Sequence, residues 1–484
     1  MLWRGYSFFP LSMAIGRQDR SSFNPAITVL DTHLRCSNPL SKMTAFQSHP
    51  IRDPLLGTIA VSGDKSISHR ALIFGAMSVG ETTITNLLEG DDVLRTAVAV
   101  RALGAGVDRR SDGTWSVHGC GVGGLHESAE VLDLGNSGTS VRLLMGLAAT
   151  LPFTTFFSGD SSLSRRPMGR VMTPLEKFGT TFVSREGLLP CAVHGAKNPP
   201  PIEHQMTVAS AQVKSAILLA GLNVPGETAV VETVPTRDHT ERMLRAFGAE
   251  VRTEETGATR RITVVGQPEL IGRAVHVPVD PSSAAFFVVA ATLIEGSDVT
   301  IERVSMNPLR AGLFEVLQEM GANITLTNTS DLNGEPVADL RVRAAPLHGI
   351  DVSPTRAPSM IDEYPVLAIA AAHARGDTVM RGLEELRVKE SNRLSAIAGG
   401  LIACGVSVEA TDDSLVVHGC GGDVPGGGQV TTHHDHRIAM AFAVLGFVAR
   451  RPVTIDDDQM IGTSFPTFTA LAEGLGGRLV ALSK

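Results

Sequence analysis

Residues 80–105, GETTITNLLEGDDVLRTAVAVRALGA, contain a strand pattern, a helix pattern and a glycine turn in succession. Residues Gly80–Leu87 carry the alternating apolar positions of a half-buried strand. A helical run follows and ends in Leu103-Gly104-Ala105. Glycine just after a helix is typical, because it adopts the left-handed conformation at little cost. The segment therefore predicts a strand and a helix closed by a turn.

This closing phrase recurs five more times. Strand-like runs precede it, for example at residues 226–231, 296–301 and 376–380. One such unit is too small to bury its own helix, so the units must share cores. The chain is longer than a single hydrophobic core can sustain. Six units therefore predict two domains of three units each. The other five phrases are Phe178-Gly179-Thr180, Phe247-Gly248-Ala249, Met320-Gly321-Ala322, Cys404-Gly405-Val406 and Leu475-Gly476-Gly477.

The composition excludes several classes of protein. Of 484 residues 43% are hydrophobic and 19% are charged, which is typical of a chain that forms a core. The net charge of -8 argues against a general nucleic-acid binder, whose footprint would be basic. The five cysteines form no CxxC pair, which argues against a disulfide scaffold or a zinc site. No apolar run approaches the length of a transmembrane helix, so we expect a soluble, cytoplasmic protein without a membrane partner.

Residues 1–43 differ in pattern from the rest. They are richer in basic than in acidic side chains, which loosely suits a transit peptide. The alternatives are an upstream start codon with Met43 as the functional start, a targeting segment or an ordered extension. We expect an N-terminal extension that is disordered or not part of the functional chain.

The densest polar segment is residues 62–70, SGDKSISHR, between an apolar strand and a helical stretch. Lys65, Ser66 and Arg70 should gather at the N-terminus of that helix, which is a natural anion site. A P-loop needs glycine directly before the lysine, and Asp64 stands there instead.

Two further segments suit an anionic ligand. Residues 133–142, DLGNSGTSVR, place small residues such as Gly138 before an apolar helix, so a ligand can approach free N–H groups. Residues 165–170, RRPMGR, contain three arginines, among them Arg166. Arginine binds phosphate or carboxylate through two hydrogen bonds. Either segment taken alone could also be a plain turn.

Two helix starts have both a structural and a functional interpretation. Ser210 is a plausible N-cap, and Ser210 and Gln212 could equally bind a hydroxyl or a phosphate. In residues 236–241, TRDHTE, helix capping explains Thr236 or Asp238 but leaves Arg237 without a role.

Carboxylates stand beside cations in the C-terminal half. Asp362 next to another helix start could be a cap, a general base or a hydroxyl anchor. In residues 386–394, LRVKESNRL, helical spacing would put Lys389 and Arg393 on one face with Glu390 beside them. A solvated, salt-bridged helix is the alternative.

The histidine-rich segment 432–440, THHDHRIAM, resembles a metal site at first sight. On a strand, His434 and His436 would share a face. No second ligand cluster stands out, and the segment runs into an apolar helix. We therefore favour an anion site at a helix start and expect no metal.

Taken together in order, six of these motifs resemble those of the 5-enolpyruvylshikimate-3-phosphate synthase family. The motifs are GDKSISHR, LGNSGTSVR, RRPMG, SAQVKSA, RVKESNRL and DHRIAM, and the similarity runs from about Leu55 to Leu482. The resemblance implies a two-domain inside-out α/β barrel-like fold, each domain built from three βαβαββ repeats. It also implies a first domain of residues 44–61 plus 278–484 and a second domain of residues 62–277.

The resemblance further implies transfer of the enolpyruvyl group of phosphoenolpyruvate to the 5-hydroxyl of shikimate-3-phosphate, in the shikimate pathway. Asp362, Glu390 and Lys65 are the implied catalytic residues. Carbon–oxygen cleavage needs no redox cofactor, so we expect none, and we expect a monomer. The residues implied to bind shikimate-3-phosphate are Lys65, Ser66, Arg70, Ser210, Ala211, Gln212, Arg237, Asp362 and Lys389. Those implied to bind phosphoenolpyruvate are Lys65, Gly138, Arg166, Gln212, Arg393 and Arg437.

Three features bear on inhibition and on phosphate binding. Segment 237–241 is similar to the class of this family noted for insensitivity to glyphosate, although insensitive members carry alanine where this chain keeps Gly138. That class also has threonine where Leu309 stands. Many members carry a lysine before a Thr-Phe-Pro-like segment, whereas Thr463-Ser464-Phe465-Pro466 has none. We expect glyphosate to inhibit this protein.

Two alternatives remain at this stage. A UDP-N-acetylglucosamine enolpyruvyltransferase would share the fold and the donor, but that family uses a loop cysteine near its Arg-Pro turn, and none lies near Arg166-Pro167. A catalytically inactive anion-binding homologue is the other.

Overall fold

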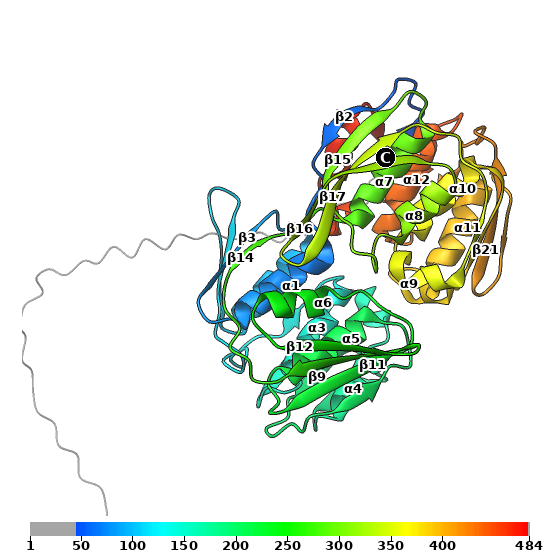
Figure 1. Ribbon diagram of the computed structural model, residues 1–484. Helices are drawn as coiled ribbons and strands as arrows, with labels where there is room; N and C mark the ends of the chain where they lie inside the picture. Colours follow the sequence, from blue (N-terminus) through cyan, green and yellow to red (C-terminus); the bar gives the residue numbers. More distant parts are fainter. Residues whose placement is uncertain (1–44, 483–484) are drawn as a thin grey trace, which may run out of the picture. The chain divides into compact units, whose positions relative to one another are not determined.

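Six four-stranded sheets form the predicted repeats (Figure 1). The computed structural model describes residues 45–482, so the predicted extension at residues 1–43 lies outside the described part. Each sheet joins one parallel pair of strands to two antiparallel strands, which is the pairing of a βαβαββ unit.

Three units are continuous in the chain. The first has β6 (Leu132–Asp133), α3 (Gly138–Ala148), β7 (Thr154–Ser158), α4 (Gly169–Glu176), β8 (Thr181–Arg185) and β9 (Leu188–His194). The second has β10 (Glu203–Gln205), α5 (Ala211–Gly221), β11 (Glu227–Glu232), α6 (His239–Ala246), β12 (Val251–Thr256) and β13 (Thr259–Val265). The third has β18 (Asp351–Val352), α9 (Ala357–Met360), α10 (Tyr364–His373), β19 (Arg375–Arg381), α11 (Arg393–Ala403), β20 (Val408–Ala410) and β21 (Ser414–Cys420).

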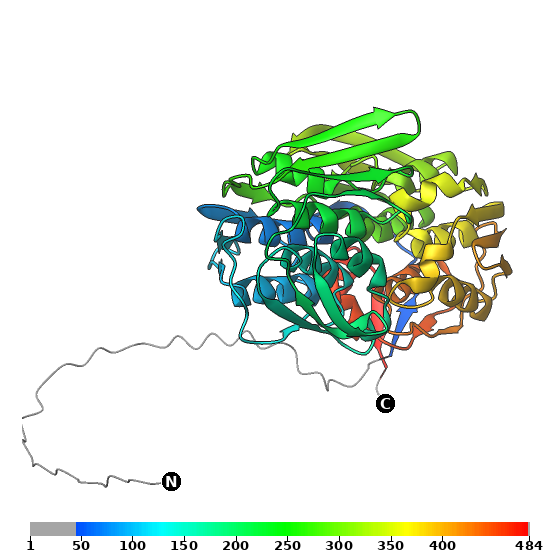
Figure 2. The same ribbon diagram turned by 90° about the horizontal axis from the view of Figure 1, so that it is seen from below.

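The other three units each take one strand from a distant part of the chain. Strand β14 (Ala274–His276) joins α1 (Lys65–Ala76), β3 (Glu81–Thr85), α2 (Asp91–Ala102), β4 (Gly106–Arg109) and β5 (Trp115–His118). Strand β2 (Leu56–Ile59) joins α7 (Pro281–Leu293), β15 (Asp298–Ser305), α8 (Gly312–Glu319), β16 (Asn323–Leu332) and β17 (Glu335–Arg343). Strand β1 (Phe46–His49) joins β22 (Gln429–Val430), α12 (His436–Val448), β23 (Val453–Ile455), α13 (Phe468–Gly474) and β24 (Arg478–Ala481). In Figure 2 the N-terminal strand, in blue, lies beside the C-terminal strands, in red.

The glycine of every repeated phrase has the predicted conformation. The six glycines have φ between +80° and +107°, and each follows the end of a helix after one or two intervening residues. The prediction of six helices that end at these turns is confirmed. The glycines are Gly104, Gly179, Gly248, Gly321, Gly405 and Gly476.

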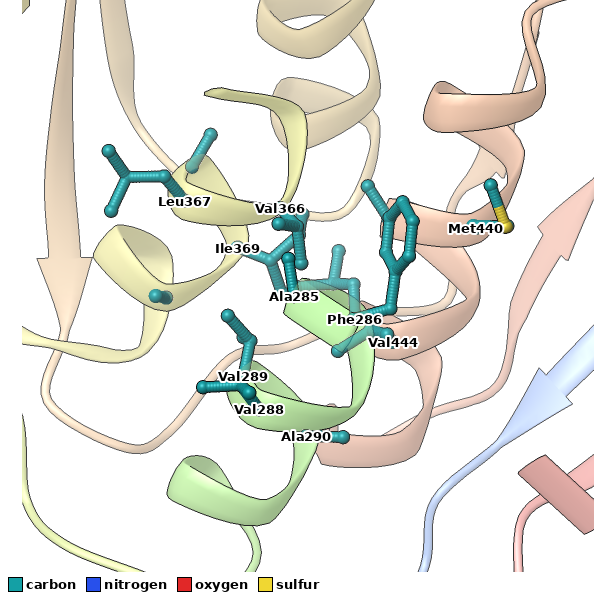
Figure 3. Packing of buried hydrophobic residues seen from close by; sticks show 14 of the residues in the cluster. Ala285, Phe286, Val288, Val289, Ala290, Val366, Leu367, Ile369, Met440 and Val444 are labelled. Carbon is teal, nitrogen blue, oxygen red and sulfur yellow. The ribbon is translucent and has the colours of Figure 1, made fainter. Parts of the chain in front are cut away.

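Helices form the centre of each core and the sheets lie outside them. Helices α7, α10 and α12 pack against one another, and nearly all of their side chains are buried (Figure 3). A helix that is apolar on all sides is stable only inside a core. A second, separate core surrounds α1, α3 and α5.

The two cores divide the chain near the predicted boundaries. One contains buried residues of 46–61 and 279–472, and the other contains buried residues of 67–277. We propose that the domains follow this division. Residues 45–61 with 278–482 are called the first lobe below, and residues 62–277 the second lobe.

Membrane-spanning helices and metal sites were both unexpected from the sequence, and the described residues bear on each. No helix between residues 45 and 482 has both the length and the apolar character needed to cross a membrane. Within the same range no group of three or more histidine, cysteine or acidic side chains is arranged to hold a metal ion.

Candidate active site

Helices of both lobes begin at one cleft between the lobes. Residues at or just before the N-termini of α1, α3 and α5 line the cleft from the second lobe, and residues at or just before those of α7, α10 and α12 line it from the first. The cavity has a volume of about 350 Å³. Each helix N-terminus contributes partial positive charge and free N–H groups, so this arrangement favours anionic ligands.

The side chains of the cleft add further positive charge. Every predicted site residue except Arg393 lines the cavity, and Arg393 lies directly behind two of the lining carboxylates. The lysines and arginines of the wall are Lys65, Arg70, Arg142, Arg166, Arg170, Arg237, Arg310, Lys389 and Arg437. The acidic residues of the wall are Asp92, Asp280, Asp362, Glu384, Glu385 and Glu390.

Asp362 lies among cations from both lobes. Its carboxylate accepts hydrogen bonds from Nη2 of Arg237 at 2.7 Å and from Nη1 of Arg393 at 3.0 Å. Nζ of Lys389 is 3.8 Å away. Burial opposes ionisation, but Lys389, Arg437 and the other two cations outweigh it and hold the pKa of Asp362 well below its usual value. Asp362 is therefore ionised at neutral pH.

Glu390 has a similar environment at the other side of Arg393. It accepts a hydrogen bond from Arg393, and Nη1 of Arg166 is 3.5 Å away. Burial opposes ionisation here too, but Arg393 and Arg166 hold the pKa of Glu390 well below its usual value. These cations thus favour the ionised form of Glu390.

Arg393 is buried, and its N–H groups bind three carboxylates. Besides Asp362 and Glu390, it donates from Nε to Asp435 at 2.8 Å. Burial disfavours the cation, but Asp435 and the other two acids raise its pKa above the usual value. In this structure Arg393 therefore fixes the two predicted catalytic carboxylates relative to each other.

Sequence reasoning missed several residues of the wall. Asp92 pairs with Lys65 at 2.5 Å, and burial nevertheless raises its pKa. Arg142 donates to Oε1 of Gln212 at 2.6 Å. Asp92 stands at the start of α2, where an acidic residue also suits the helix dipole. The presence of an acidic residue there therefore did not predict a functional site. Arg142 could have been found, because it ends the quoted segment 133–142.

The helix start at residues 236–241 agrees only in part with the capping interpretation. Ser210 caps α5 as predicted, by accepting from N of Val213. Asp238 stands at the N-cap position of α6 as predicted, but its side chain accepts from Arg242 and Asn307 and makes no capping hydrogen bond. Thr236 donates to Glu232 at 2.8 Å. The position of the cap is therefore confirmed, without the capping hydrogen bond.

One local prediction is wrong, whereas the favoured helix start at residues 435–437 is confirmed. Helix α11 begins only at Arg393, after a 3₁₀ turn at Glu384–Val388 and an irregular link, so Lys389 and Arg393 do not share a helix face. His434 has φ of +60° in a turn rather than a strand, and His436 opens α12. The turn directs His434 to Asp457, with Nδ1 at 3.0 Å from the carboxylate, and puts His436 in the cleft wall.

His436 should make the stability of the fold depend on pH. Burial, with help from Lys65 and Arg437, holds its pKa well below 6.5. The unfolded chain binds a proton near pH 6.5 and the folded chain does not, so the free energy of unfolding must fall as pH drops below 6.5. One such histidine contributes a slope of at most about 1.4 kcal/mol per pH unit. Urea unfolding at pH 5.5, 6.5 and 7.5 should give a shallower slope for His436→Gln, and equal slopes would contradict this assignment.

Comparisons of the sequence with known proteins show the family. A model of the family described as EPSP synthase (3-phosphoshikimate 1-carboxyvinyltransferase) matches residues 50–471. A 3-phosphoshikimate 1-carboxyvinyltransferase of Paramagnetospirillum magneticum is 62% identical over 88% of this chain and 96% of the relative. Another, of Parvibaculum lavamentivorans, is 60% identical over 88% of this chain and 95% of the relative.

Solved structures give the same result. An EPSP synthase from Acinetobacter baumannii matches with a TM-score of 0.81 and 43% identity, over 91% of this chain and 100% of that one. The enolpyruvyl transferase NikO from Streptomyces tendae matches with a TM-score of 0.72 at 18% identity, over 92% and 100%. The fold is thus the two-domain inside-out α/β fold of the enolpyruvyl transferases. Within that class, the chain belongs to the EPSP synthase family.

Proposed function

We propose that this protein transfers the enolpyruvyl group of phosphoenolpyruvate to the 5-hydroxyl of shikimate-3-phosphate and releases phosphate. The convergence of helix N-termini from both lobes and of nine cations on one cleft supports this proposal most directly. Each substrate has a phosphate and a carboxylate, so the site must bind four anionic groups. Charge-assisted hydrogen bonds, worth roughly 1.5–3 kcal/mol each, suit that task.

The two substrates would lie against different lining residues. For shikimate-3-phosphate we propose Lys65, Ser66, Arg70, Ser210, Ala211, Gln212, Arg237, Asp362 and Lys389. For phosphoenolpyruvate we propose Lys65, Gly138, Arg166, Gln212 and Arg437 in the wall, with Arg393 behind it. Lys65 and Gln212 belong to both sets, so the substrates would meet beside them.

The reaction balances with a proton added and later lost. A proton adds to the vinyl carbon of phosphoenolpyruvate while the 5-hydroxyl attacks its neighbour and loses its own proton. Phosphate then leaves from the tetrahedral intermediate, and loss of a methyl proton restores the double bond. We assign the carbon proton to Glu390 and the hydroxyl proton to Asp362, with Lys65 in the wall of the same cleft. An anion bound at Arg166 would weaken the hold of Arg166 on Glu390 and raise the pKa of Glu390.

A phosphate-release assay with a choice of acceptors tests the activity. We expect release from phosphoenolpyruvate when shikimate-3-phosphate is present and none when UDP-N-acetylglucosamine replaces it. Release with the sugar nucleotide would support the alternative transferase, and release with neither acceptor would support an inactive homologue.

We also propose that the protein acts as a monomer in the cytoplasm. Both walls of the cleft come from a single chain, so the site needs no second copy. The four cysteines between residues 45 and 482 are free thiols, which suits a reducing compartment. Light scattering during size-exclusion chromatography would give the mass, and a dimer would contradict the monomer.

Gly138→Ala should weaken inhibition by glyphosate. A Cβ at this position would lie 3.0 Å from Nη1 of Arg166 and 3.1 Å from Nη1 of Arg142, so both guanidinium groups would have to shift. Glyphosate is a phosphonate longer than phosphoenolpyruvate, so it has less room to adapt to that shift. We expect the half-inhibitory concentration to rise at least about tenfold, and the KM for phosphoenolpyruvate to rise less.

Gly169→Ala is the matched control. Gly169 begins α4, and an added Cβ there would meet no atom within 4 Å. Inhibition of this control should equal that of the unsubstituted protein. Equal inhibition of Gly138→Ala and the control would contradict the assigned position of Gly138.

A further inference from the structure

Residues directly after Arg237 bind the opposite lobe. Asp238 accepts a hydrogen bond from Nδ2 of Asn307 at 2.7 Å, and Nδ1 of His239 lies 2.7 Å from Oε1 of Glu335. Asp238 and His239 belong to the second lobe, whereas Asn307 and Glu335 belong to the first. All four are buried, with exposures of 5%, 1%, 0% and 2% in the same order.

Asn307 bridges the two carboxylates. Its Nδ2 also donates to Oε2 of Glu335 at 2.9 Å, and its Oδ1 accepts from N of Leu309 at 3.0 Å. This network fixes the orientation of the amide, because a flipped amide would place its oxygen against both acids. Two buried carboxylates of opposite lobes are thus held together by one NH₂ group.

The turn of the β16–β17 hairpin extends this contact. Arg242 of α6 donates from Nη1 to the carbonyl of Gly334 at 2.8 Å and from Nε to Asp238 at 2.9 Å. Asn333 donates to the carbonyl of His276 at 3.3 Å. The turn residues next to Glu335 therefore also contact the second lobe (the hairpin is the pair β16 and β17 in Figure 1).

This cluster gives a role to Asp238 and His239, which are not among the residues proposed to bind substrate. Arg237 reaches across the interface to Asp362, and the next two residues of the chain anchor its backbone to the first lobe. We infer that Asn307 and Glu335 are positioning residues, which act through Asp238 and His239 to hold Arg237 at the shikimate-3-phosphate site. The inference rests on the proposed function for the identity of the ligand.

Asn307→Asp is the sharpest test, because it keeps the side-chain shape and turns both donors into an acceptor that faces two carboxylates. We expect the KM for shikimate-3-phosphate to rise by about tenfold and the KM for phosphoenolpyruvate to change much less. Glu335→Gln, a milder change, should move the same constant in the same direction. If both variants keep the unsubstituted KM values, the inference is wrong.

Asn328→Asp provides a matched control on the same hairpin. Asn328 donates to Asp339 at 2.6 Å, so the substitution also brings two carboxylates together, but at an exposed position within the first lobe. Its kinetic constants should stay unchanged.

A double-mutant cycle separates positioning from mere stability. If Asn307 acts through Arg237, Asn307→Asp should add almost nothing to the KM of Arg237→Ala. Effects that multiply would mean that the cluster only stabilises the fold. Calorimetric binding of shikimate-3-phosphate needs no turnover and should show the same non-additivity.

X-ray scattering tests the contact between the lobes even if the proposed function is wrong. If the unsubstituted protein neither turns over nor binds shikimate-3-phosphate, the function is wrong, and the radius of gyration still tests the contact. Asn307→Asp should enlarge that radius relative to Asn328→Asp. An unchanged radius would overturn the inference independently of the ligand.

Discussion

We expect Glu390→Gln to lower kcat by about 100-fold or more, since general acid–base catalysis contributes 10²–10⁴-fold. Glutamine keeps the size of the side chain and can still accept from Arg393, so the KM of each substrate should change far less than kcat. Steady-state kinetics with both substrates varied measures the two effects separately.

Glu384→Gln is the control for this substitution. Glu384 lies in the wall of the same cleft, but it is exposed and the chemistry assigns it no proton. Its kcat should stay near that of the unsubstituted protein. Near-normal turnover of Glu390→Gln would remove Glu390 from the mechanism.

Asp362→Asn should have an effect on kcat of similar size, for a different reason. The carboxylate is assigned the hydroxyl proton, and its charge also balances Arg237, Arg393 and Lys389. Loss of that charge takes this partner from Arg237 and Lys389, while Arg393 keeps Glu390 and Asp435, so we also expect the free energy of unfolding to fall by up to about 3 kcal/mol.

The two losses at Asp362 can be separated. Kinetics well below the melting temperature, with the folded fraction checked by circular dichroism, reports only on the chemistry. A variant that is fully folded and turns over normally would show that Asp362 has a structural role alone.

The fold was largely predictable because its repeats carry a local signal. The six glycines stand where a positive φ is needed, and that requirement depends only on the neighbouring helix end. Strands β1, β2 and β14 were harder, since their partners lie in distant parts of the chain. The repeats predicted two domains, but the boundaries between them followed from family resemblance and not from periodicity.

The candidate site was predictable where motifs lie at helix starts. Lys65, Gly138 and Ser210 were found because helix N-termini have recognisable patterns. Asp92 and Asn307 were not, because their importance comes from partners far away in sequence, Lys65 and Asp238. No local pattern predicts such a contact.

The charge state of Glu390 shows a second limit of sequence reasoning. Its residue type suits a proton donor, yet Arg393 and Arg166 lower its pKa and keep it ionised. That shift depends on the three-dimensional arrangement of charges, which the residue type alone does not predict.

The central claim is transfer of the enolpyruvyl group with cleavage of the carbon–oxygen bond. Phosphoenolpyruvate labelled with ¹⁸O at the bridging oxygen tests it directly when it is mixed with shikimate-3-phosphate and the protein. Mass spectrometry should find the label in the released phosphate and an unlabelled enolpyruvyl ether of shikimate-3-phosphate. Label retained in pyruvate, with shikimate-3-phosphate unchanged, would mean hydrolysis at phosphorus and would contradict the proposed function.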